Sequence, residues 1–318
     1  MPTTAKPLQV LFDAIHHDKH DFRDFLHGDI AANYTVLRDK RRSIYRPTKK
    51  LKAYHVFLNT FVFEYLTINP RVLYSYRKGV NPHQVVAVHS QNRAFFQTDL
   101  MNFFGSINRE LVRSTVLERG SLVPITDLHE HLERILDLTT IEGLLPVGFP
   151  TSPLISNACL TGFDDELESH CRANALTYTR YADDIVISAQ SREELQNIDS
   201  TVAGLLTTHF SGSLRLNSAK SKVTTVGRKV KILGMVITPS GRVTVDMELK
   251  RRIEVLLHFY IRDRAKFSAM VEHNTRAGIE QLVGYVNYIN TADKLYLEKL
   301  RKKYGTTVID SFLHRSAT

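Results

Sequence analysis

Residues 178–188 read Tyr-Thr-Arg-Tyr-Ala-Asp-Asp-Ile-Val-Ile-Ser, and the rest of the chain is organised around them. Two adjacent acids, Asp183 and Asp184, stand between runs of β-branched and aromatic residues. Such runs favour β-strands, so the stretch predicts a hairpin with both carboxylates at its tip and with sides that pair in a sheet. Two anions this close repel each other unless a cation binds them. An Asp pair is also common in hydrated turns, because Asp hydrogen-bonds to nearby backbone, so the interpretation depends on other residues.

The composition is that of an ordinary globular protein: of 318 residues, 43% are hydrophobic and 24% are charged. This is enough material for a sizeable core in one multi-lobed unit or in two domains. No apolar run approaches membrane-spanning length, and the first residues lack the basic-then-apolar layout of a secretory signal. We therefore expect a cytoplasmic protein with no membrane partner. The two cysteines, Cys159 and Cys171, are too few for a disulfide framework or a zinc cluster.

Positive charge is concentrated early in the chain. The net charge is +9, yet residues 38–93 alone carry twelve Lys or Arg against two acids. Tyrosines and phenylalanines are interleaved through this segment, a mixture that suits phosphate contacts combined with base stacking. A solvated basic helix face would give the same charge, so the count leaves both interpretations open. Residues 240–318 are also basic, with fourteen Lys or Arg against nine acids.

A third acid ends a second predicted strand. Residues 93–100 read Arg-Ala-Phe-Phe-Gln-Thr-Asp-Leu, a short apolar strand with Asp99 at its carboxyl end. An acid at the end of a buried strand is costly unless it is paired, hydrogen-bonded or bound to a metal ion. Asp99 is therefore a further candidate ligand for a cation.

A loop rich in proline and glycine lies between these acids in the sequence, with Leu-Leu-Pro-Val-Gly-Phe-Pro-Thr-Ser-Pro at 144–153. Gly148 allows a ligand to approach the backbone closely. Ser152 is expected to cap a helix over 154–173, and Asn157 lies one turn into that helix, facing the loop. The acids of the same helix are interpreted as its solvated face: Asp164, Asp165, Glu166 and Glu168.

The remaining pattern mixes strands and helices, with no internal repeat and no glycine-rich phosphate-binding motif. Proline and glycine interrupt the chain at 69–70 and 79–82. We expect further strands near 43–45, 214–223 and 231–238, and helices over 51–66, 109–141 with a break at 119–124, 191–210 and 248–318.

In this order, a strand ending in Asp99, a Pro-Gly loop and an Asp-Asp hairpin resemble the palm of a reverse transcriptase. Tyr181-Ala-Asp-Asp184 is similar to the YxDD motif of that family. Residues 96–104, Phe-Gln-Thr-Asp-Leu-Met-Asn-Phe-Phe, resemble its first catalytic motif, and residues 145–153 resemble the loop that contacts template and incoming nucleotide. The loop, the Tyr-Thr-Arg-Tyr-Ala-Asp-Asp run and the compact length without an appended nuclease are most similar to bacterial retron reverse transcriptases, from about residue 38 to residue 304.

Two motifs depart from the retron pattern. Retron enzymes carry Asn-Ala-x-x-His before the first catalytic strand, where this chain has Val85-Val-Ala-Val-His89 or, less closely, a stretch that uses Asn81. They also show Val-Thr-Gly where this chain has Ile232-Leu-Gly234, a form closer to the reverse transcriptases of group II introns and of some phage-defence lineages. The resemblance to a polymerase depends on neither motif.

The resemblance implies an α+β right-hand polymerase fold with fingers, a palm of antiparallel sheet backed by helices, and a helical thumb. The implied division is an N-terminal helical extension at 1–35, fingers at 36–98, a palm at 99–236 with inserted fingers helices at 109–143, and a thumb at 237–318.

The resemblance also implies two divalent ions, Mg²⁺ with Mn²⁺ as a substitute, that support nucleotidyl transfer. Asp99 and Asp183 would span both ions, Asp184 would be a weaker ligand, and the backbone of Leu100 would add one oxygen. Hard oxygen donors and a substrate triphosphate favour Mg²⁺.

Other residues match positions that hold the nucleotide. Arg42 matches the basic residue that grips the triphosphate, with Lys40 and Arg41 as rivals. Phe104 matches the aromatic residue that lies beneath the nucleotide sugar and excludes a 2′-hydroxyl, which implies a preference for deoxynucleotides. A plain core phenylalanine is the alternative interpretation of Phe104.

Lys220 matches the lysine that protonates the departing pyrophosphate, with Lys222 as a rival and an ordinary surface lysine as the alternative. Gly148 is assigned to the nucleotide site. The residues assigned to primer and template are Pro150, Ser152, Asn157, Tyr181 and Gly234.

These matches predict an RNA-directed DNA polymerase that copies a structured noncoding RNA, with an RNA–DNA hybrid and dNTPs as ligands. The implied role is retron-type anti-phage defence, with msDNA as product and a separate effector protein as partner. One alternative is a defence reverse transcriptase of another lineage that primes on protein or works without a template. Another is a non-catalytic RNA-binding scaffold for a toxin partner, although an idle site has no chemical reason to hold three carboxylates together.

Overall fold

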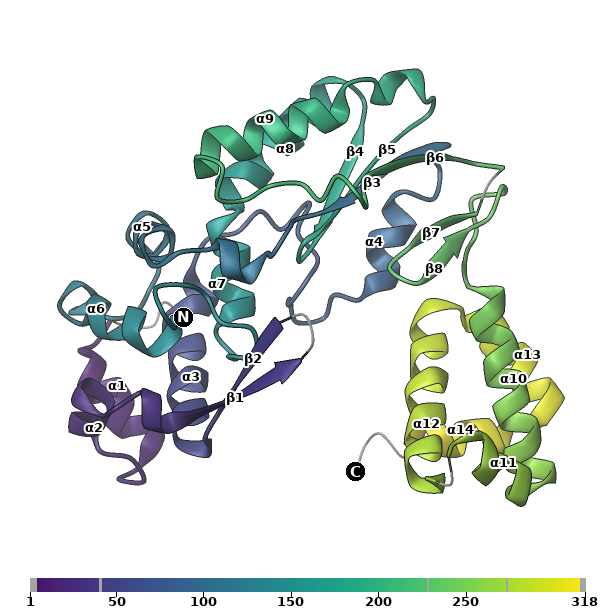
Figure 1. The fold of residues 1–318 in the computed structure, drawn as a ribbon, viewed down its shortest axis with the longest axis horizontal. Helices are drawn as coiled ribbons and strands as arrows, with labels where there is room; N and C mark the ends of the chain where they lie inside the picture. Colours follow the sequence, from purple (N-terminus) through teal and green to yellow (C-terminus); the bar gives the residue numbers. More distant parts are fainter. Residues whose placement is uncertain (1–4, 40–41, 228, 273, 315–318) are drawn as a thin grey trace. The chain divides into compact units, whose positions relative to one another are not determined.

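The computed structural model describes residues 5–39, 42–227, 229–272 and 274–314 (Figure 1). The chain divides into two compact units, and each unit is made from separate stretches of sequence. The first comprises Met1–Lys78, Phe96–Ile187 and Gln196–Lys222, and the second comprises Gly79–Phe95, Ser188–Leu195 and Val223–Thr318. Among the described residues, no helix is both long and apolar enough to cross a membrane.

Helices make up most of the first unit. They are α1 (Leu8–His16), α2 (Phe22–His27), α3 (Lys49–Phe61), α5 (Arg109–Arg119), α6 (Leu128–Thr139), α7 (Ser152–Cys159), α8 (Thr161–Ala173) and α9 (Ile198–Phe210). Phe12 of α1 is fully buried, and its ring centroid lies 5.1 Å from that of Phe25 and 5.4 Å from that of Phe57. Large aromatic side chains bury much apolar area, so this cluster holds α1 and α2 against α3.

A two-stranded antiparallel hairpin also belongs to the first unit. It consists of β1 (Tyr34–Asp39) and β2 (Arg42–Pro47), with Val36 opposite Tyr45. The ring of Tyr45 lies 5.6 Å from that of Tyr34 and 6.3 Å from that of Phe149. Since Phe149 belongs to the Pro-Gly loop, these aromatic contacts attach the hairpin to the loop.

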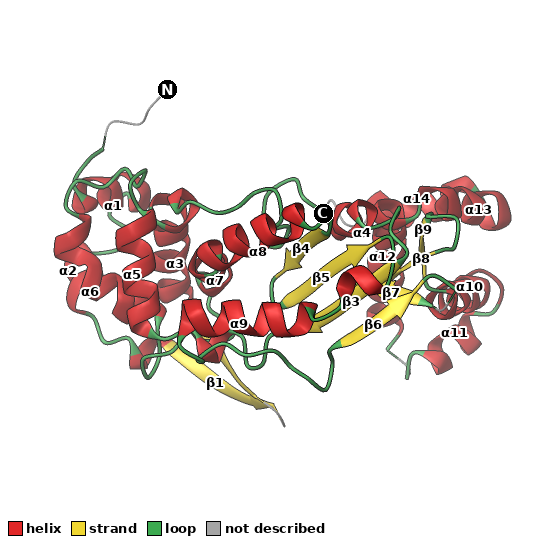
Figure 2. Cartoon of the chain, turned by 90° about the horizontal axis from the view of Figure 1, so that it is seen from above, coloured by secondary structure: helices red, strands yellow, loops and turns green. Residues whose placement is uncertain are grey.

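A four-stranded sheet carries the predicted acids. β3 (Ala94–Asp99), β4 (Thr177–Tyr181), β5 (Asp184–Ala189) and β6 (Lys222–Thr225) lie in the order β4-β5-β3-β6. Nearly every residue of β3 and β5 is buried, which explains why both strands read as continuous apolar runs. α8 packs against β4 and α9, and both helices lie along one side of the sheet (Figure 2).

The second unit combines a small sheet with the C-terminal helices. β7 (Val230–Ile232), β8 (Met235–Ile237) and β9 (Val243–Val245) form an antiparallel sheet, against which α4 (Pro82–Val88) packs. The helices are α10 (Met247–Arg262), α11 (Arg264–Met270), α12 (Thr275–Ala292), α13 (Lys294–Tyr304) and α14 (Thr306–His314). Their fully buried core residues include Leu257, Phe267, Leu282 and Phe312.

The helix predicted over 154–173 is two helices, α7 and α8, and the prediction that Ser152 caps the first is wrong. The Ser152 hydroxyl is buried and donates to the Pro146 carbonyl at 2.6 Å, while Thr151 occupies the N-cap position. The Pro146 carbonyl is turned inward by the loop and needs a donor, so it takes the hydroxyl that a cap would have used.

Other predicted elements shift because turns interrupt them. Apart from a bridge between Leu216 and Leu100, residues 214–221 form turns and irregular structure rather than a strand. The strand predicted at 231–238 is a hairpin, because Leu233 and Gly234 have positive φ angles of 47° and 81° and reverse the chain between β7 and β8. The helix predicted from 191 becomes a regular α-helix only at Ile198.

Gly148 lets the Pro-Gly loop lie directly against the β1–β2 hairpin. Its φ is +105°, and a Cβ at this position would lie 2.4 Å from the Tyr45 carbonyl oxygen. The Tyr45 N–H donates to the carbonyl of the neighbouring Val147 at 2.8 Å. The close approach that this glycine permits is therefore to the backbone of the chain itself.

Replacing Gly148 with Ala should destabilise the protein by about 1–3 kcal/mol, because both the strained φ and the contact with Tyr45 must be relieved. Gly204 offers a matched control, since it lies inside α9 and an added Cβ would meet no heavy atom within 4 Å. Gly204→Ala should stabilise by about 0.5–1 kcal/mol through helix propensity. Urea unfolding compares the two variants, and equal effects would contradict this role of Gly148.

Candidate active site

The hairpin predicted from the sequence is present. β4 ends at Tyr181 and β5 begins at Asp184, so only Ala182 and Asp183 connect them. Ala182 has a left-handed φ of 57° and is buried. This tight connection places Asp183 and Asp184 side by side at one end of the sheet.

Asp99 lies close to the hairpin because β3 is the neighbour of β5 in the sheet. The Leu100 N–H donates to the Asp183 carbonyl at 3.1 Å, which ties the end of β3 to the hairpin turn. Oδ2 of Asp99 is paired with the Lys220 ammonium, whereas its Oδ1 is buried and has no hydrogen-bond partner within the described parts of the chain. The three acids named from the sequence thus lie at adjoining strand ends.

A turn that is bonded to β3 positions Lys220. The Asn217 N–H donates to the Asp99 carbonyl at 2.8 Å, and the Asn217 carbonyl accepts from the N–H groups of Lys220 and Ser221 at 2.9 and 3.1 Å. The hydroxyls of Ser221 and Thr98 are hydrogen-bonded at 2.7 Å. These contacts hold the backbone of Lys220 beside the last residues of β3.

Burial and repulsion make the carboxyl groups of Asp183 and Asp184 hard to ionise. Burial raises the pKa of Asp183, and the negative charge of Asp99 acts in the same direction. Asp184 is exposed, yet burial of its surroundings, followed by the charges of Asp183 and Asp99, raises its pKa to about 6. The hydrogen bond to Asp99 raises the pKa of Lys220, which keeps that side chain protonated.

A divalent cation fits this site. It would give the unpartnered Asp99 Oδ1 a partner and would relieve the repulsion that raises the carboxyl pKa values. Carboxylate oxygens are hard donors that suit Mg²⁺ and Mn²⁺. Among the residues that the structure describes, no three His, Cys, Asp or Glu side chains form a ready-made metal cluster. This is typical of Mg²⁺ sites in which one or two carboxylates bind the ion together with substrate phosphates.

A cavity of about 340 Å³ opens beside the carboxylates. Asp99, Asp184, Lys220 and Lys222 all line it, so the two lysines named from the sequence face the same space. Lys220 is the one that pairs with Asp99. The cavity therefore combines carboxylate oxygens with cationic groups, the combination that a triphosphate with its cation would require.

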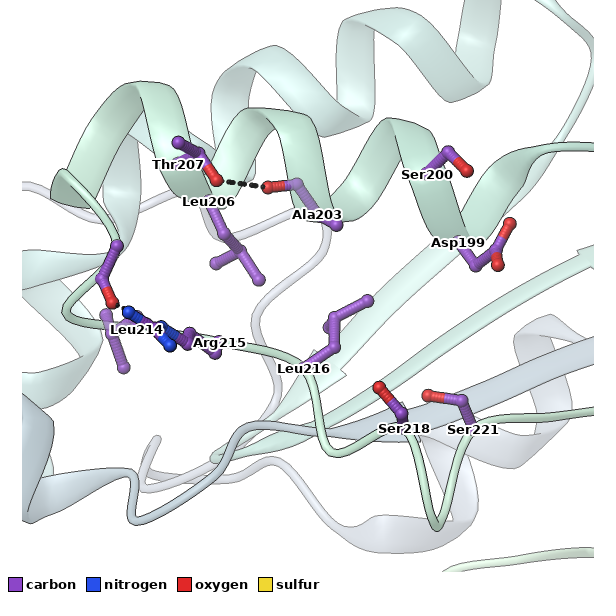
Figure 3. A pocket seen from close by; sticks show the side chains of 11 residues that line it. Asp199, Ser200, Ala203, Leu206, Thr207, Leu214, Arg215, Leu216, Ser218 and Ser221 are labelled. Carbon is purple, nitrogen blue, oxygen red and sulfur yellow. Dashed lines mark hydrogen bonds between the residues drawn. The ribbon is translucent and has the colours of Figure 1, made fainter.

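A larger cavity of about 710 Å³ lies between α9 and the segment 212–221 (Figure 3). Its lining mixes one acid and one base, Asp199 and Arg215, with leucines and hydroxyl groups. The Arg215 guanidinium donates to the Gly212 carbonyl at 2.8 Å, so its position is set within the segment. Because none of the three acids at the strand ends lines this cavity, we place the chemistry in the smaller one.

Phe104 follows the Asp99 strand in a 3₁₀ turn and is half-buried. Its ring lies 5.2 Å from that of Phe103, which is the more deeply buried of the two. Arg42 is exposed at the start of β2, and Lys40 and Arg41 lie outside the described residues. The contacts of Phe104 with a sugar and of Arg42 with a triphosphate stay predictions.

The loop residues assigned to primer and template are bonded within the chain. The Asn157 amide donates to the Ser75 carbonyl at 2.9 Å, and its Oδ1 accepts from the Ser75 hydroxyl at 3.2 Å. The Pro150 carbonyl accepts from the Asn59 amide at 2.9 Å. Like the inward bond of Ser152, these contacts shape the loop from inside, and direct nucleic-acid contacts stay predictions.

Tyr181 and Gly234 remain the other two assigned positions. Tyr181 is partly exposed at the end of β4, next to the acids. Gly234 lies in the β7–β8 turn of the second unit, where an added Cβ would lie 3.3 Å from the Tyr288 hydroxyl. The sequence-based assignment of both residues to primer or template stays a prediction.

Two features near the hairpin turn were missed by sequence reasoning. Tyr76 has a positive φ of 55° and is 44% exposed; burial, followed by the charge of Asp183, raises its pKa. Arg180 is fully buried and pairs with Asp164, an acid that was wrongly interpreted as solvated. For Arg180, the one available signal in the sequence was a charged residue inside a strand predicted to be buried. Long-range packing, which a local sequence pattern does not report, sets the conformation of Tyr76 and the ion pair of Arg180.

Comparison with known proteins identifies the class that this fold and site define. Residues 37–237 match the family described as reverse transcriptase (RNA-dependent DNA polymerase). The chain belongs to this family. It is an RNA-directed DNA polymerase with an α+β right-hand polymerase fold, as the sequence predicted.

Within the family, the chain is similar to retron reverse transcriptases, which confirms the predicted resemblance. It is 27% identical to the Retron Ec83 reverse transcriptase of Escherichia coli over 302 residues, which cover 92% of this chain and 93% of that one. It is 26% identical to the Retron Ec73 reverse transcriptase of the same organism, over 83% of each chain. Among solved structures, apo telomerase from Candida tropicalis aligns with 67% of this chain and 54% of that one, at 10% identity and a TM-score of 0.45.

Without a bound cation, Asp184→Asn should raise the melting temperature at about pH 7. The pKa of Asp184 is about 6 in the folded state against an ordinary 3.8, so folding opposes its ionisation. The protonated Asp184 carboxyl therefore makes its full contribution to the free energy of unfolding below about pH 4, and this contribution is lost as the pH rises through about 6. Asn cannot ionise, so the advantage of the variant should vanish near about pH 4.

Thermal unfolding in EDTA across this pH range measures the effect. Ser200→Ala, an exposed change on α9 outside the lining of the cavity that holds Asp99 and Asp184, serves as a control that should show no such pH dependence. A variant Asp184→Asn that melts below the wild type at neutral pH would show that the carboxylate stabilises the fold.

Proposed function

We propose that this enzyme copies a structured noncoding RNA into DNA by two-metal nucleotidyl transfer, within a retron-type system of anti-phage defence. The observation that carries the proposal is the grouping of Asp99, Asp183 and Asp184 at adjoining strand ends, with Lys220 paired to Asp99. The similarity to retron reverse transcriptases over most of the chain supports the retron assignment.

Asp99 and Asp183 would hold two divalent ions, with Asp184 and the Leu100 carbonyl as supporting ligands. Mg²⁺ is the proposed ion and Mn²⁺ its substitute. When bound, such ions neutralise charge on the reacting phosphoryl group and align it for in-line displacement. The chain contributes the placement of these oxygens, which the Leu100–Asp183 backbone bond and the tight hairpin connection define.

Lys220 would protonate the pyrophosphate as it departs. A lysine ammonium is ordinarily protonated at neutral pH, and the hydrogen bond to Asp99 raises its pKa further, so Lys220 carries the proton that a general acid must donate. Its position is set by the turn that Asn217 attaches to β3. Lys222 lines the same cavity and is the rival for this role.

The remaining assignments form one proposed path for substrate and nucleic acid. Arg42 would bind the triphosphate, Phe104 would lie beneath the sugar, and the loop at Gly148 would lie beside the nucleotide. Primer and template would contact Pro150, Ser152, Asn157, Tyr181 and Gly234. In this scheme residues 1–35 are an N-terminal extension, 36–98 the fingers, 99–236 the palm with inserted helices at 109–143, and 237–318 the thumb.

The basic segments at 38–93 and 240–318 support a polyanionic partner, which we propose is the RNA template and then the RNA–DNA hybrid. The product would be msDNA, formed in the cytoplasm where dNTPs are available. A separate effector protein would carry out the defence response.

Purified protein should extend oligo(dT) on poly(rA) with dTTP and Mg²⁺, and EDTA should abolish the product. Asp183→Asn should reduce the rate at least 10³-fold, roughly as expected for loss of a metal ligand, and at least as much as Asp184→Asn. The wild-type enzyme should incorporate ribonucleotides poorly. The Phe104→Ala variant should incorporate them better, because the ring would no longer exclude the 2′-hydroxyl. Radiolabelled products on denaturing gels provide the readout, and equal activity of wild type and Asp183→Asn would refute the metal-ligand role.

Nucleic acid that co-purifies with the active enzyme from its native host should be one branched RNA–DNA species whose RNA is encoded beside the gene. Sequencing before and after RNase treatment, with Asp183→Asn as a control, identifies template and product. DNA of varied sequence, or DNA attached to protein, would instead indicate a defence reverse transcriptase of another lineage. The departures at 85–89 and 232–234 are the observation that favours that second candidate.

A further inference from the structure

A fully buried ion pair lies beneath the catalytic hairpin. The side chains of Arg180 on β4 and Asp164 on α8 both have an exposed fraction of 0%. The guanidinium binds both carboxylate oxygens, with Nε donating to Oδ1 at 2.8 Å and Nη2 donating to Oδ2 at 2.6 Å. The Tyr178 hydroxyl also donates to Oδ1, at 2.7 Å. Asp164 therefore holds the guanidinium in a single orientation.

In that orientation, Arg180 reaches the hairpin turn. Its Nη1 donates at 3.0 Å to the Ala182 carbonyl, which belongs to the peptide bond that joins Ala182 to Asp183. Ala182 has a left-handed φ of 57°, which is unfavourable for alanine because its Cβ lies close to the following carbonyl. The Ala182 carbonyl, which the left-handed turn directs inward, thus accepts a hydrogen bond from a charged donor. Such a hydrogen bond is stronger than one from a neutral donor.

The backbone of Arg180 is itself held in place by a neighbouring segment. Its N–H donates to the Val72 carbonyl at 2.8 Å, and its carbonyl accepts from the Tyr74 N–H at 3.0 Å. Its Nη2 also lies 3.4 Å from the Asn157 carbonyl, at which it is directed as a donor. With its backbone and its carboxylate partner both held, the guanidinium acts as a rigid support for the turn.

We propose that Arg180 is a positioning residue that holds the left-handed turn at Ala182 and thereby directs the Asp183 carboxylate toward the catalytic ions. The proposal rests on the metal-binding role proposed for Asp183. Replacing a buried ion pair with apolar residues is often neutral for stability, so stability alone gives little reason for this pair here. A planar guanidinium, unlike an ammonium, binds a carboxylate through two nitrogens and still offers a third to another acceptor.

Two variants remove the support in different ways. Arg180→Lys keeps a positive charge for Asp164 but cannot maintain the forked contact and the bond to Ala182 together. Arg180→Gln combined with Asp164→Asn removes both buried charges at once, so that neither remains unpaired if Arg180→Lys does not fold. Each is made with and without Ala182→Gly, because glycine adopts the left-handed φ without strain. Tyr178→Phe is the control, since it removes a hydrogen bond to the same carboxylate but does not touch the turn.

The Mg²⁺ concentration that gives half-maximal extension of oligo(dT) on poly(rA) should rise about tenfold in both Arg180 variants, as expected once the left-handed turn is unsupported. The KM for template–primer should stay near that of the wild type. Mn²⁺ binding to the free protein, followed by EPR, should weaken by a similar factor. Ala182→Gly should restore at least about a third of the loss, and Tyr178→Phe should leave both metal measurements as in the wild type.

Unchanged metal dependence and Mn²⁺ binding in folded Arg180 variants would overturn the proposal, as would an equal change in Tyr178→Phe. Circular dichroism and melting temperatures establish which variants are folded. If the wild type itself fails to extend the primer, the proposed polymerase reaction fails, whereas the Mn²⁺ titrations still test the role of Arg180.

Discussion

The constraint on which the site depends is the repulsion among three carboxylates held close together at adjoining strand ends. A sheet in which β3 neighbours β5 brings Asp99 next to the Asp183–Asp184 turn. The raised pKa values of Asp183 and Asp184 show that the fold works against their ionisation. Only strong local support keeps such groups together, and the structure supplies it through the Leu100–Asp183 backbone bond and the Lys220 ion pair. The fold therefore accepts a loss of stability at this edge of the sheet, which the cations proposed for this site would relieve.

The surroundings of the acids are rigid for a related reason. The Pro-Gly loop is held by the hydrogen bond of the Ser152 hydroxyl and by the close contact of Gly148 with Tyr45. The segment that carries Tyr76 is held by a hydrogen bond from the Asn157 amide. A site that relies on charge placement needs neighbours that do not move when a charged substrate arrives. Residues that look like ligand contacts in the sequence therefore also serve as structural supports.

Local pattern was enough to predict the hairpin that carries Asp183 and Asp184 and the strand that ends in Asp99, because in both cases acids adjoin short runs rich in apolar residues. It was not enough for Asp164, which stands among other acids on α8 and looks solvated, although a partner 16 residues later buries it completely. Ser152 failed as a predicted cap for the same reason: its hydroxyl is used by a carbonyl of the preceding loop. Tyr76, whose φ is positive, follows Ser75, and the Ser75 carbonyl accepts from the Asn157 amide of α7. What escaped the sequence was in each case a tertiary partner of a polar group.

The strand order β4-β5-β3-β6 has a consequence for how the chain folds. β3 precedes every other strand of this sheet in the sequence, yet it is paired on both sides by strands that follow it much later. The ion pair of Asp99 and Lys220 alone closes a loop of 121 residues. Pairing between strands this far apart in the sequence costs chain entropy before any strand contacts form. This cost slows folding, and the edges of the strand stay unpaired in the meantime. A nascent chain that has emerged only as far as α8 would expose both edges of β3, so this enzyme is most vulnerable to misassociation during its synthesis.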